Sequence, residues 1–375
     1  MGKTNYKRRV ALLVLVLALA LVPAAAAKVG PRVTIGVYGD SVVEGYTIPH
    51  YLRDSLVPQL RTTVARVGGF QLGAGGFVPV TAFRWNFSRY TVAGKEDTDP
   101  NAWVLSGFAS FGADGLSGYS GIALSPNVTA TTPIDGPFVA VLFTKFNGSG
   151  IFTVTAGSQT YSIDARSIGP PTPSQQWITV PPGTKSITVH GPSSGSIIFD
   201  GAIVRSPVTP GRIGVEVENL GHMGHRLSED SAPRTLAALS QQRFDISIFM
   251  DSYIWEFAAA GGSNKFEQGY EAELRARVAL VRDYGGMCLV ADPSPLPISQ
   301  KVVARFAAID KKVAGELGCT YFTGFAHLWN PATAVQRGLV LIDDVHPRAP
   351  GYRLLAQAIA PTLAKLVRTR VRTRH

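Results

Sequence analysis

Serine, histidine and aspartate occur at two distant places in the chain where they could together form a nucleophilic site. Ser41 ends a Gly-Asp-Ser tripeptide that follows the apolar run 33–38, and this run predicts a buried strand. Asp343 and His346 lie three residues apart, just before a helix-like stretch. A serine hydroxyl becomes a good nucleophile when a base takes its proton and an acid orients that base. The spacing predicts a triad of these three residues at the carboxyl edge of a sheet.

Each motif also has a purely structural interpretation. Gly-Asp-Ser is a common turn sequence, and Asp-Asp-Val-His alone is compatible with a solvated loop. Their conjunction at opposite ends of one α/β pattern favours catalysis. The order Ser, Asp, His is shared with α/β-hydrolases, but those enzymes use Gly-x-Ser-x-Gly and place acid and base on separate loops. Here the serine lies in Gly39-Asp40-Ser41, and Asp343 and His346 share one loop.

This combination resembles the SGNH (GDSL-like) hydrolase family, whose first block is Gly-Asp-Ser and whose last block is Asp-x-x-His. The resemblance implies a flavodoxin-like, three-layer α/β/α sandwich. It also implies a hydrolase of carboxylic esters, since the family consists mostly of esterases, lipases, thioesterases and carbohydrate deacetylases. Neither a metal ion nor an organic cofactor is needed for this chemistry.

The donors that would stabilise an oxyanion are only partly recognisable. The backbone N–H of Ser41 is one candidate, and Gly224 best matches the glycine of the family's second block. The family's third block, Gly-x-Asn-Asp, is replaced here by residues 249–256, Phe-Met-Asp-Ser-Tyr-Ile-Trp-Glu. Ser252 or Tyr253 is a candidate third donor, whereas Asp251 would only accept unless it were protonated.

A metal site is not expected. His222 and His225 flank the Gly224 block at a spacing of three residues, which is compatible with a metal pair. No third ligand lies near them in the sequence, and most protein zinc sites need at least three protein ligands.

The chain has an α/β part that is interrupted by a region of different composition and hydrophobic pattern. Leu52, Leu56 and Leu60 predict one helix face after the first strand, with Pro58 expected to kink or shorten the helix. From residue 213 onward, strands alternate with helices, which is typical of parallel βαβ units. The expected elements are strands 213–219, 245–250, 287–291 and 320–322, and helices 232–243, 266–284 and 299–317.

The intervening region predicts an inserted all-β domain, because it is rich in glycine, proline and short alternating runs. Runs 138–144 and 150–155, joined by Asn147-Gly148, predict a hairpin. The layout resembles exported SGNH esterases with a carbohydrate-binding-like β-sandwich module. The aromatic residues of this region could stack on sugars, but each is better explained as core (Trp85, Trp103, Tyr119 and Trp177). The expected boundaries are 28–67 and 211–366 for the hydrolase domain and 68–210 for the insertion.

Residues 1–27 predict a cleaved signal peptide, because a basic start is followed by a 13-residue apolar run and by small residues. An uncleaved N-terminal anchor is the alternative. The formal net charge is +10, but the signal region contributes four positive charges and the stretch from Lys365 contributes five, so the body is nearly neutral. Nucleic-acid binding has no supporting motif. We expect the basic tail, 367–375, to be a frayed end that could make a weak contact with an anionic surface.

The two cysteines, Cys288 and Cys319, each begin a predicted strand of the same sheet. An exported protein can keep a disulfide, so a bond between them is one interpretation. Two buried thiols that behave as small hydrophobic groups are the other.

Taken together, the sequence predicts a secreted or extracytoplasmic serine esterase that removes O-acyl groups, with acetyl expected, from carbohydrate or a cell-envelope polymer. An acyltransferase that uses the same acyl-enzyme is one alternative, and a lipase or thioesterase is another. A non-catalytic, glycan-binding envelope protein is the alternative of a different class, motivated by the missing asparagine of the third block.

Overall fold

The computed structural model describes most of the chain from residue 30 to residue 374. The described ranges are 30–44, 55–72, 76–79, 83–84, 103–106, 110–114, 120–221, 243–251, 265–295, 297, 299–341 and 345–374. Side chains within these ranges are described except at residues 41, 44, 76–79, 83–84, 110–114, 120–121 and 265. Within the described part of the chain, no helix combines the length and apolar character that a bilayer crossing requires.

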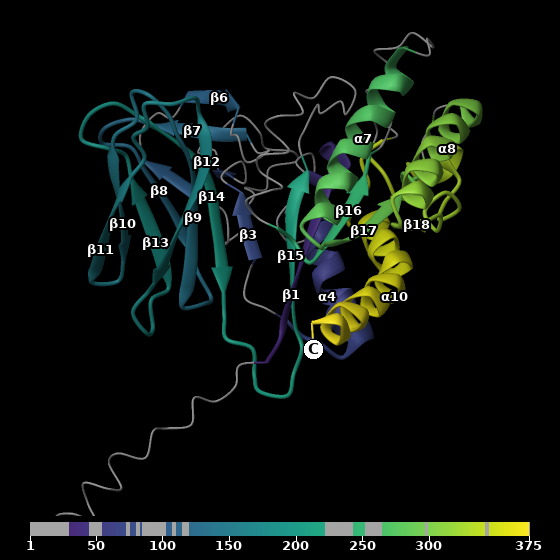
Figure 1. Cartoon of the computed structure of the whole chain (residues 1–375), viewed down its shortest axis with the longest axis horizontal. Helices are drawn as coiled ribbons and strands as arrows, with labels where there is room; N and C mark the ends of the chain where they lie inside the picture. The colour runs from purple at the N-terminus through teal and green to yellow at the C-terminus, as the bar shows by residue number, and fades with distance from the viewer. Residues whose placement is uncertain are drawn as a thin grey trace, which may run out of the picture.

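A six-stranded sheet forms the α/β part, and its strand order is β18-β17-β16-β1-β15-β2. Every pairing within it is parallel. Its strands are β1 (Arg32–Gly39), β2 (Gln71–Leu72), β15 (Gly214–Gly221), β16 (Ile246–Met250), β17 (Met287–Ala291) and β18 (Thr320–Phe322). The predicted parallel βαβ pattern is therefore confirmed. Because all strands point the same way, their carboxyl ends meet at one edge of the sheet (Figure 1).

Helices cover both faces of this sheet. On one face α4 (Leu56–Gly68) packs against α10 (Ala349–Thr373), and on the other α7 (Lys265–Asp283) packs against α8 (Gln300–Glu316). The alternation of β1 explains the division, since successive side chains of a strand point to opposite faces. Val33, Ile35 and Val37 join the α4–α10 core, whereas Tyr38 joins the α7–α8 core. Two short helices, α2 (Ser41–Glu44) and α9 (Pro331–Ala334), lie in connections.

Two expectations about helices are corrected by the structure. Pro58 does not kink α4, because it lies in the first turn, where a missing backbone N–H breaks no helical bond. The basic tail is not frayed either, since α10 continues to Thr373 and Val367 is fully buried. Arg370 Nε donates to Asp245 Oδ1 at 3.1 Å, and Arg374 donates to the same oxygen. These contacts hold the last turns of α10 against the amino edge of the sheet.

Two further sheets are built from residues between α4 and β15, and they lie beside the α/β part (Figure 1). One has the order β11-β10-β13-β8-β5-β4, and the other has β12-β9-β14-β7-β6, with β3 paired to β14. Their strands are β3 (Gly76–Pro79), β4 (Phe83–Arg84), β5 (Trp103–Ser106), β6 (Ser110–Asp114), β7 (Ser120–Leu124), β8 (Thr129–Pro133), β9 (Phe138–Lys145), β10 (Ile151–Ala156), β11 (Gln159–Asp164), β12 (Thr172–Thr179), β13 (Ser186–His190) and β14 (Ile197–Arg205).

Both sheets contribute to one hydrophobic core. Trp103 is fully buried there and meets Phe199 edge-to-face, with 4.9 Å between ring centroids, so its predicted core role is confirmed. Trp177 is only partly buried and packs against a second core, and Trp85 and Tyr119 lie outside the described residues.

The predicted hairpin of residues 138–155 is wrong. β9 pairs with β12 and β14, whereas β10 pairs with β11 and β13, so the Asn147-Gly148 turn carries the chain from one sheet to the other. Residues 139–144 are all buried, because one face of β9 meets the core shared by the sheets and the other meets the α/β part. A strand buried on both faces finds its partners from distant sequence, and the local turn signal does not report them.

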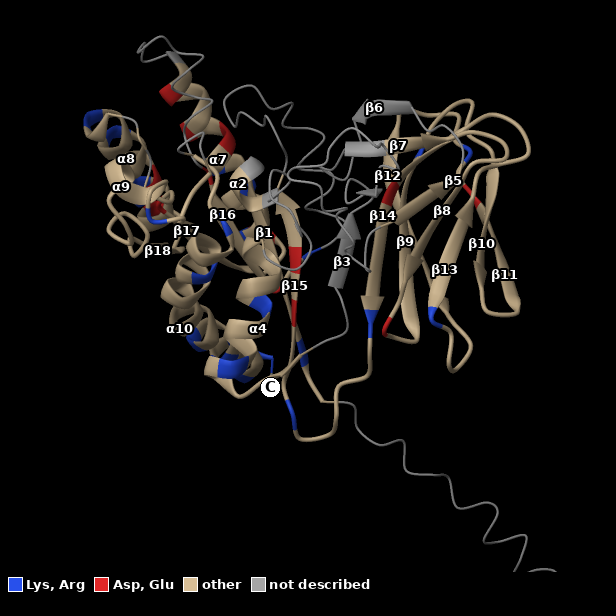
Figure 2. Ribbon diagram, turned by 180° about the vertical axis from the view of Figure 1, so that it is seen from behind, with Lys and Arg blue, Asp and Glu red and all other residues tan. Residues whose placement is uncertain are grey.

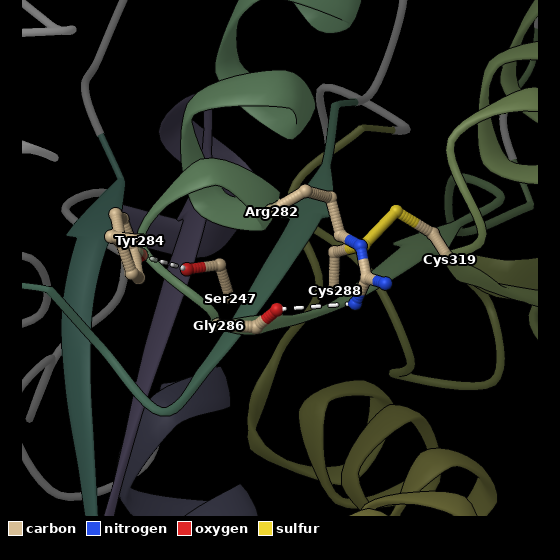
Figure 3. The surroundings of a disulfide bond; sticks show 6 residues. All are labelled: Ser247, Arg282, Tyr284, Gly286, Cys288 and Cys319. Atoms are coloured by element: carbon tan, nitrogen blue, oxygen red, sulfur yellow. Dashed lines mark hydrogen bonds between the residues drawn. A yellow bond between two sulfur atoms is a disulfide. The ribbon is translucent and has the colours of Figure 1, made fainter.

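Cys288 and Cys319 form a disulfide with a Cα–Cα distance of 4.9 Å (Figure 3). The bond joins β17 to the residue that precedes β18, so the two strands at this end of the sheet are covalently linked. Of the two interpretations that the sequence left open, the structure shows the disulfide. Nearby, Arg282 Nη1 donates to the backbone oxygen of Gly286 at 3.3 Å and fixes the turn from α7 into β17 (Figure 3).

Candidate active site

Ser41 opens α2, two residues after the carboxyl end of β1. The turn that presents it depends on Gly39, because a Cβ there would lie 2.0 Å from the backbone oxygen of Met250 and 2.5 Å from Val43 Cγ2. Only glycine allows β1 and β16 to approach this closely. Ser41 therefore lies at the carboxyl edge, as predicted, although its side chain is outside the described set.

Asp40 closes the same turn. Its side chain is buried, with Oδ1 accepting the N–H of Val42 at 2.9 Å, and its backbone oxygen accepts the N–H of Val43 at 3.1 Å. Such short-range bonds from aspartate satisfy the free N–H groups at a helix start. The aspartate of Gly-Asp-Ser thus has a structural role in fixing the backbone around Ser41.

The neighbouring strands bring the other two motif regions to Ser41. Gly39 is paired with Gly221 on β15 and with Met250 on β16. Asp251 follows Met250 directly and is buried, which places the start of the predicted third block beside the Gly39-Asp40-Ser41 turn. Gly224 comes three residues after Gly221, but Gly224, Ser252 and Tyr253 lie outside the described residues.

His346 is held in place through its backbone. Its carbonyl oxygen accepts the N–H of Leu341 at 2.8 Å, and Arg348 donates to the oxygen of Leu339 at 2.8 Å. Its neighbour Pro347 bridges to Val340 between these two bonds. His346 is partly exposed, and the segment that carries it leads directly into α10. Asp343, its predicted partner, lies outside the described residues.

The direction of α10 places His346 at the same edge as Ser41. Residues near the end of this helix reach the amino edge, where Arg374 Nη1 donates to the oxygen of Arg32 at 2.9 Å. The helix has 25 residues, or about 37 Å at 1.5 Å per residue, whereas the eight residues of β1 span about 26 Å. A helix that ends at the amino edge and exceeds the strand in length begins at or beyond the carboxyl edge.

Two polar residues at this edge were not singled out from the sequence. Asn219 Oδ1 accepts the N–H of Gly221 at 3.0 Å and shapes the exit of β15. Asp292 follows β17 and is buried, with its two oxygens accepting the N–H groups of Phe325 at 3.3 Å and Ala326 at 3.2 Å. Burial raises the pKa of Asp292 to about 6, against the opposing effect of these donors. For Asp292 the available signal was a polar residue directly after a buried strand.

The described residues contain no group of three or more His, Cys, Asp or Glu side chains that could hold a metal ion. His222 and His225 lie outside them. The described part of the carboxyl edge therefore contributes the Gly39-Asp40-Ser41 turn, the segment that carries His346, and buried acids.

No protein-family model matches the chain, and no curated protein matches it. Among solved structures, the chain is similar to a peptidoglycan O-acetylesterase with a TM-score of 0.62 and 18% sequence identity; the alignment covers 91% of this chain and 93% of that one. This likeness establishes the fold. The resemblance to SGNH-type esterases expected from the sequence motifs is thus confirmed at the level of the fold, and the likeness includes the mixed α/β architecture with several sheets.

Two carbohydrate esterases match less well. An acetylxylan esterase from Geobacillus stearothermophilus is 20% identical with a TM-score of 0.33, and covers 41% of this chain and 73% of its own. A family two carbohydrate esterase from Cellvibrio japonicus is 13% identical with a TM-score of 0.31, and covers 72% of this chain and 96% of its own.

Proposed function

We propose that this protein is an exported SGNH-type serine esterase that hydrolyses O-acyl esters, with acetyl as the expected group, on carbohydrate or a cell-envelope polymer. The observation that carries the proposal is the fold shared with a peptidoglycan O-acetylesterase over nine-tenths of the chain, together with Ser41 and His346 at one edge of the sheet.

In the proposed mechanism Ser41 attacks the ester carbonyl while His346 takes its proton. His346 then protonates the departing sugar oxygen, which leaves as a free hydroxyl group, and Asp343 orients the imidazole. The backbone N–H groups of Ser41 and Gly224 stabilise the oxyanion, with Ser252 or Tyr253 as third donor. Water then attacks the acyl-enzyme and releases the acid.

The arrangement of parts belongs to the same proposal. Residues 28–72 and 211–373 form a three-layer hydrolase domain, which extends past the expected ends at 67 and 366 because it includes β2 and the whole of α10. The two smaller sheets form an inserted β-sandwich that recognises the polymer. The insertion starts after Leu72, because β2 pairs with β15 in the hydrolase sheet. The likeness to a peptidoglycan O-acetylesterase supports an extracytoplasmic location, with residues 1–27 as the signal peptide.

The test is hydrolysis of p-nitrophenyl acetate by the unmodified protein and by Ser41→Ala, combined with labelling by a fluorophosphonate. We expect turnover to fall by at least about 1,000-fold in the variant, because the acyl-enzyme requires the hydroxyl. The label should be found on Ser41 by mass spectrometry. Ser162→Ala removes an exposed hydroxyl on β11 and should retain full turnover and labelling.

Retained turnover in Ser41→Ala would exclude the mechanism. Absence of both turnover and labelling in the unmodified protein would favour the non-catalytic, glycan-binding alternative. Transfer of the acyl group to an added glycan, in preference to water, would identify an acyltransferase.

A further inference from the structure

A cavity of about 320 Å³ lies between the α/β sheet and the β12-β9-β14 sheet, away from the proposed catalytic residues. It is lined by Arg32 at the start of β1 and by five residues of the smaller sheet, namely Phe138, Trp177, Ile178, Thr179 and Arg205. Since Arg32 begins β1 and Ser41 follows its end, the cavity lies at the edge of the sheet opposite the nucleophile.

Strand register explains why these side chains meet. Phe138 is paired with Thr179 on one side and with Arg205 on the other, so the three side chains share a face. Two residues further along β9, Ala140 is paired with Trp177, and it packs into the buried core beside Leu220 of β15. The cavity therefore lies where the contact between the α/β sheet and the β12-β9-β14 sheet opens to solvent.

Two acids on β15 lie behind the arginines. Glu216 and Glu218 point toward the smaller sheet, because Val215 and Val217 point to the α4–α10 core. Arg205 Nε donates to Glu216 Oε2 at 2.8 Å, and its Nη2 lies 3.7 Å from Glu218 Oε1. Figure 2 marks acidic positions along β15 and a basic position at the end of β14.

The solvent side of this cluster is cationic. The side chains of Glu216 and Glu218 are only 1% and 0% exposed, whereas those of Arg32 and Arg205 are 25% and 24% exposed. A ligand that enters the cavity meets guanidinium groups before it meets a carboxylate. Guanidinium groups bind carboxylates through paired N–H donors, which favours a ligand that carries this group.

The cluster also has surplus positive charge. Burial and the neighbouring Glu216 raise the pKa of Glu218 to about 8, so Glu218 is mainly protonated at neutral pH. Arg32 and Arg205 then face one ionised carboxylate at most. Arg61, which interacts electrostatically with both Glu216 and Asp135, adds a charge that Asp135 balances. An anionic ligand group would complete the pairing.

The aromatic residues complete the recognition surface. Arg205 lies over the ring of Trp177, with 4.5 Å between its Cζ and the ring centroid, which fixes the guanidinium and occupies that ring face. Phe138 is 39% exposed and offers an apolar surface to a ligand. The C–H face of a pyranose chair can pack on such a surface.

We propose that this cavity binds a sugar residue that carries a carboxylate group. Its volume is at the lower end of ligand sites, about 300–1,000 Å³, and suits a single residue. The inference rests on the proposed function in taking this residue from the polymer substrate, and it makes that substrate an acidic glycan. The cavity anchors the polymer about 26 Å from Ser41, from the rise of β1, and takes no part in the chemistry.

The experiment is a titration of Ser41→Ala protein with matched sugars, in which nuclear magnetic resonance measures the binding. Glucuronic acid is compared with glucose, N-acetylmuramic acid with N-acetylglucosamine, and sodium acetate serves as the carboxylate without a sugar. We expect each acidic sugar to bind at least ten-fold more tightly than its neutral partner and than acetate. Arg32→Gln and Phe138→Ser should each weaken acidic-sugar binding by at least five-fold. Arg166→Gln replaces an exposed arginine that follows β11 and should leave binding unchanged.

Equal binding of acidic and neutral sugars, binding of acetate as tight as that of the acidic sugars, or no binding would overturn the inference. So would unchanged affinity in both Arg32→Gln and Phe138→Ser, once their melting temperatures show that they are folded. Because binding is measured in a protein without the serine, it is independent of esterase activity. Selective binding by a protein that hydrolyses no ester would refute the proposed function while leaving the acidic-sugar site in place.

Discussion

Gly39 sets how closely β1, the strand that precedes Ser41, approaches its neighbour β16. The Gly-Asp-Ser sequence combines three separate requirements at this turn. Glycine permits the contact with Met250, aspartate accepts the N–H of Val42, and serine occupies the first position of the following helical turn. The motif thus fixes the backbone conformation as well as supplying a hydroxyl, because the position of Ser41 depends on Gly39 and Asp40.

Gly39→Ala should reduce ester hydrolysis and also lower stability by about 1–3 kcal/mol, the usual cost of overpacking a tight site. The added Cβ would force β16 away and shift Ser41. Activity against p-nitrophenyl acetate and denaturant unfolding measure the two effects. Gly315→Ala on α8 is the matched control, since its Cβ meets nothing within 4 Å and alanine favours a helix. An unaltered Gly39→Ala protein would contradict this view of the turn.

Glu218 should make the protein less stable as the pH rises. Its pKa is raised from 4.5 to about 8, so the folded state binds the proton more tightly than the unfolded state. The resulting stabilisation is complete below pH 4.5 and is lost as the pH rises through 8. Neither oxygen has a hydrogen-bond partner among the described residues, so the ionised form is poorly compensated.

Glu218→Gln should therefore melt at a higher temperature than the unmodified protein at pH 8.5 and at nearly the same temperature at pH 4.5. Melting temperatures across this pH range provide the measurement. Replacement of Glu271 by glutamine is the control, and its effect on stability should depend on pH in the opposite direction. Hydrogen bonds from Lys312 and Arg275 lower the pKa of Glu271, whereas the pKa of Glu218 is raised. A Glu218→Gln profile parallel to that of the unmodified protein would show that this carboxyl does not titrate as described.

Among the elements, α10 connects the two edges of the sheet. Its first residues follow His346 at the carboxyl edge, and its last turn is fixed to Asp245 at the amino edge. Asp245 also accepts the backbone N–H of Thr34 at 2.9 Å, so one carboxylate joins β1, β16 and α10. The helix can hold His346 accurately because both of its ends are anchored.

Asp245→Asn should destabilise the protein by about 3 kcal/mol, because it removes the charge that pairs two arginines at a buried position. Hydrogen exchange at the end of α10 should become faster, and the free energy of unfolding should fall in denaturant titrations. Asp164→Asn removes an exposed pair with Arg166 and should leave the melting temperature unchanged. A similar response of both variants would show that Asp245 is no more than a surface contact.

The disulfide should contribute about 3–4 kcal/mol, the loop-entropy value for cysteines 31 residues apart. Replacing both Cys288 and Cys319 by alanine should lower the free energy of unfolding by this amount. Treatment of the unmodified protein with a reductant should lower the melting temperature to a similar degree. A melting temperature that is insensitive to the reductant would mean that the bond is absent or remains protected in the purified protein.

Sequence patterns predicted the α/β elements well, because the periodicity of each strand or helix is a local property. The expected strands 287–291 and 320–322 coincide with β17 and β18. The strand partners of β9 were beyond prediction, since its burial on both faces depends on a core built from residues far apart in sequence. The end of α10 was beyond prediction for the same reason. Its arginines favour a solvent-exposed tail when the sequence is considered alone, and their partner Asp245 lies far away in the chain.

At the scale of the whole molecule, the proposed triad combines the first and last parts of the described chain. The place of Ser41 at the carboxyl edge could be predicted because it follows a buried strand of a parallel sheet, whereas its pairing with His346 stays a prediction. The cavity beside Arg205 could not be predicted, since it exists only where the smaller sheets meet β1 and β15. The sequence around β14 and β15 contains both acids and arginines, so it shows no excess of positive charge. In the structure Glu216 and Glu218 are buried and Arg205 remains partly exposed to solvent.

Arg374, at the end of α10, donates to the backbone oxygen of Arg32, at the start of β1. Gly30, two residues earlier, donates its N–H to the oxygen of Val208. The first and last described residues therefore lie close together at the amino edge of the sheet. Both ends of the folded body therefore leave it from the side opposite Ser41. Anything fused to either end, whether a tag, a tether or a surface for immobilisation, would keep clear of the carboxyl edge that carries Ser41. A protein immobilised through its C-terminus should present Ser41 outward, toward an insoluble polymer.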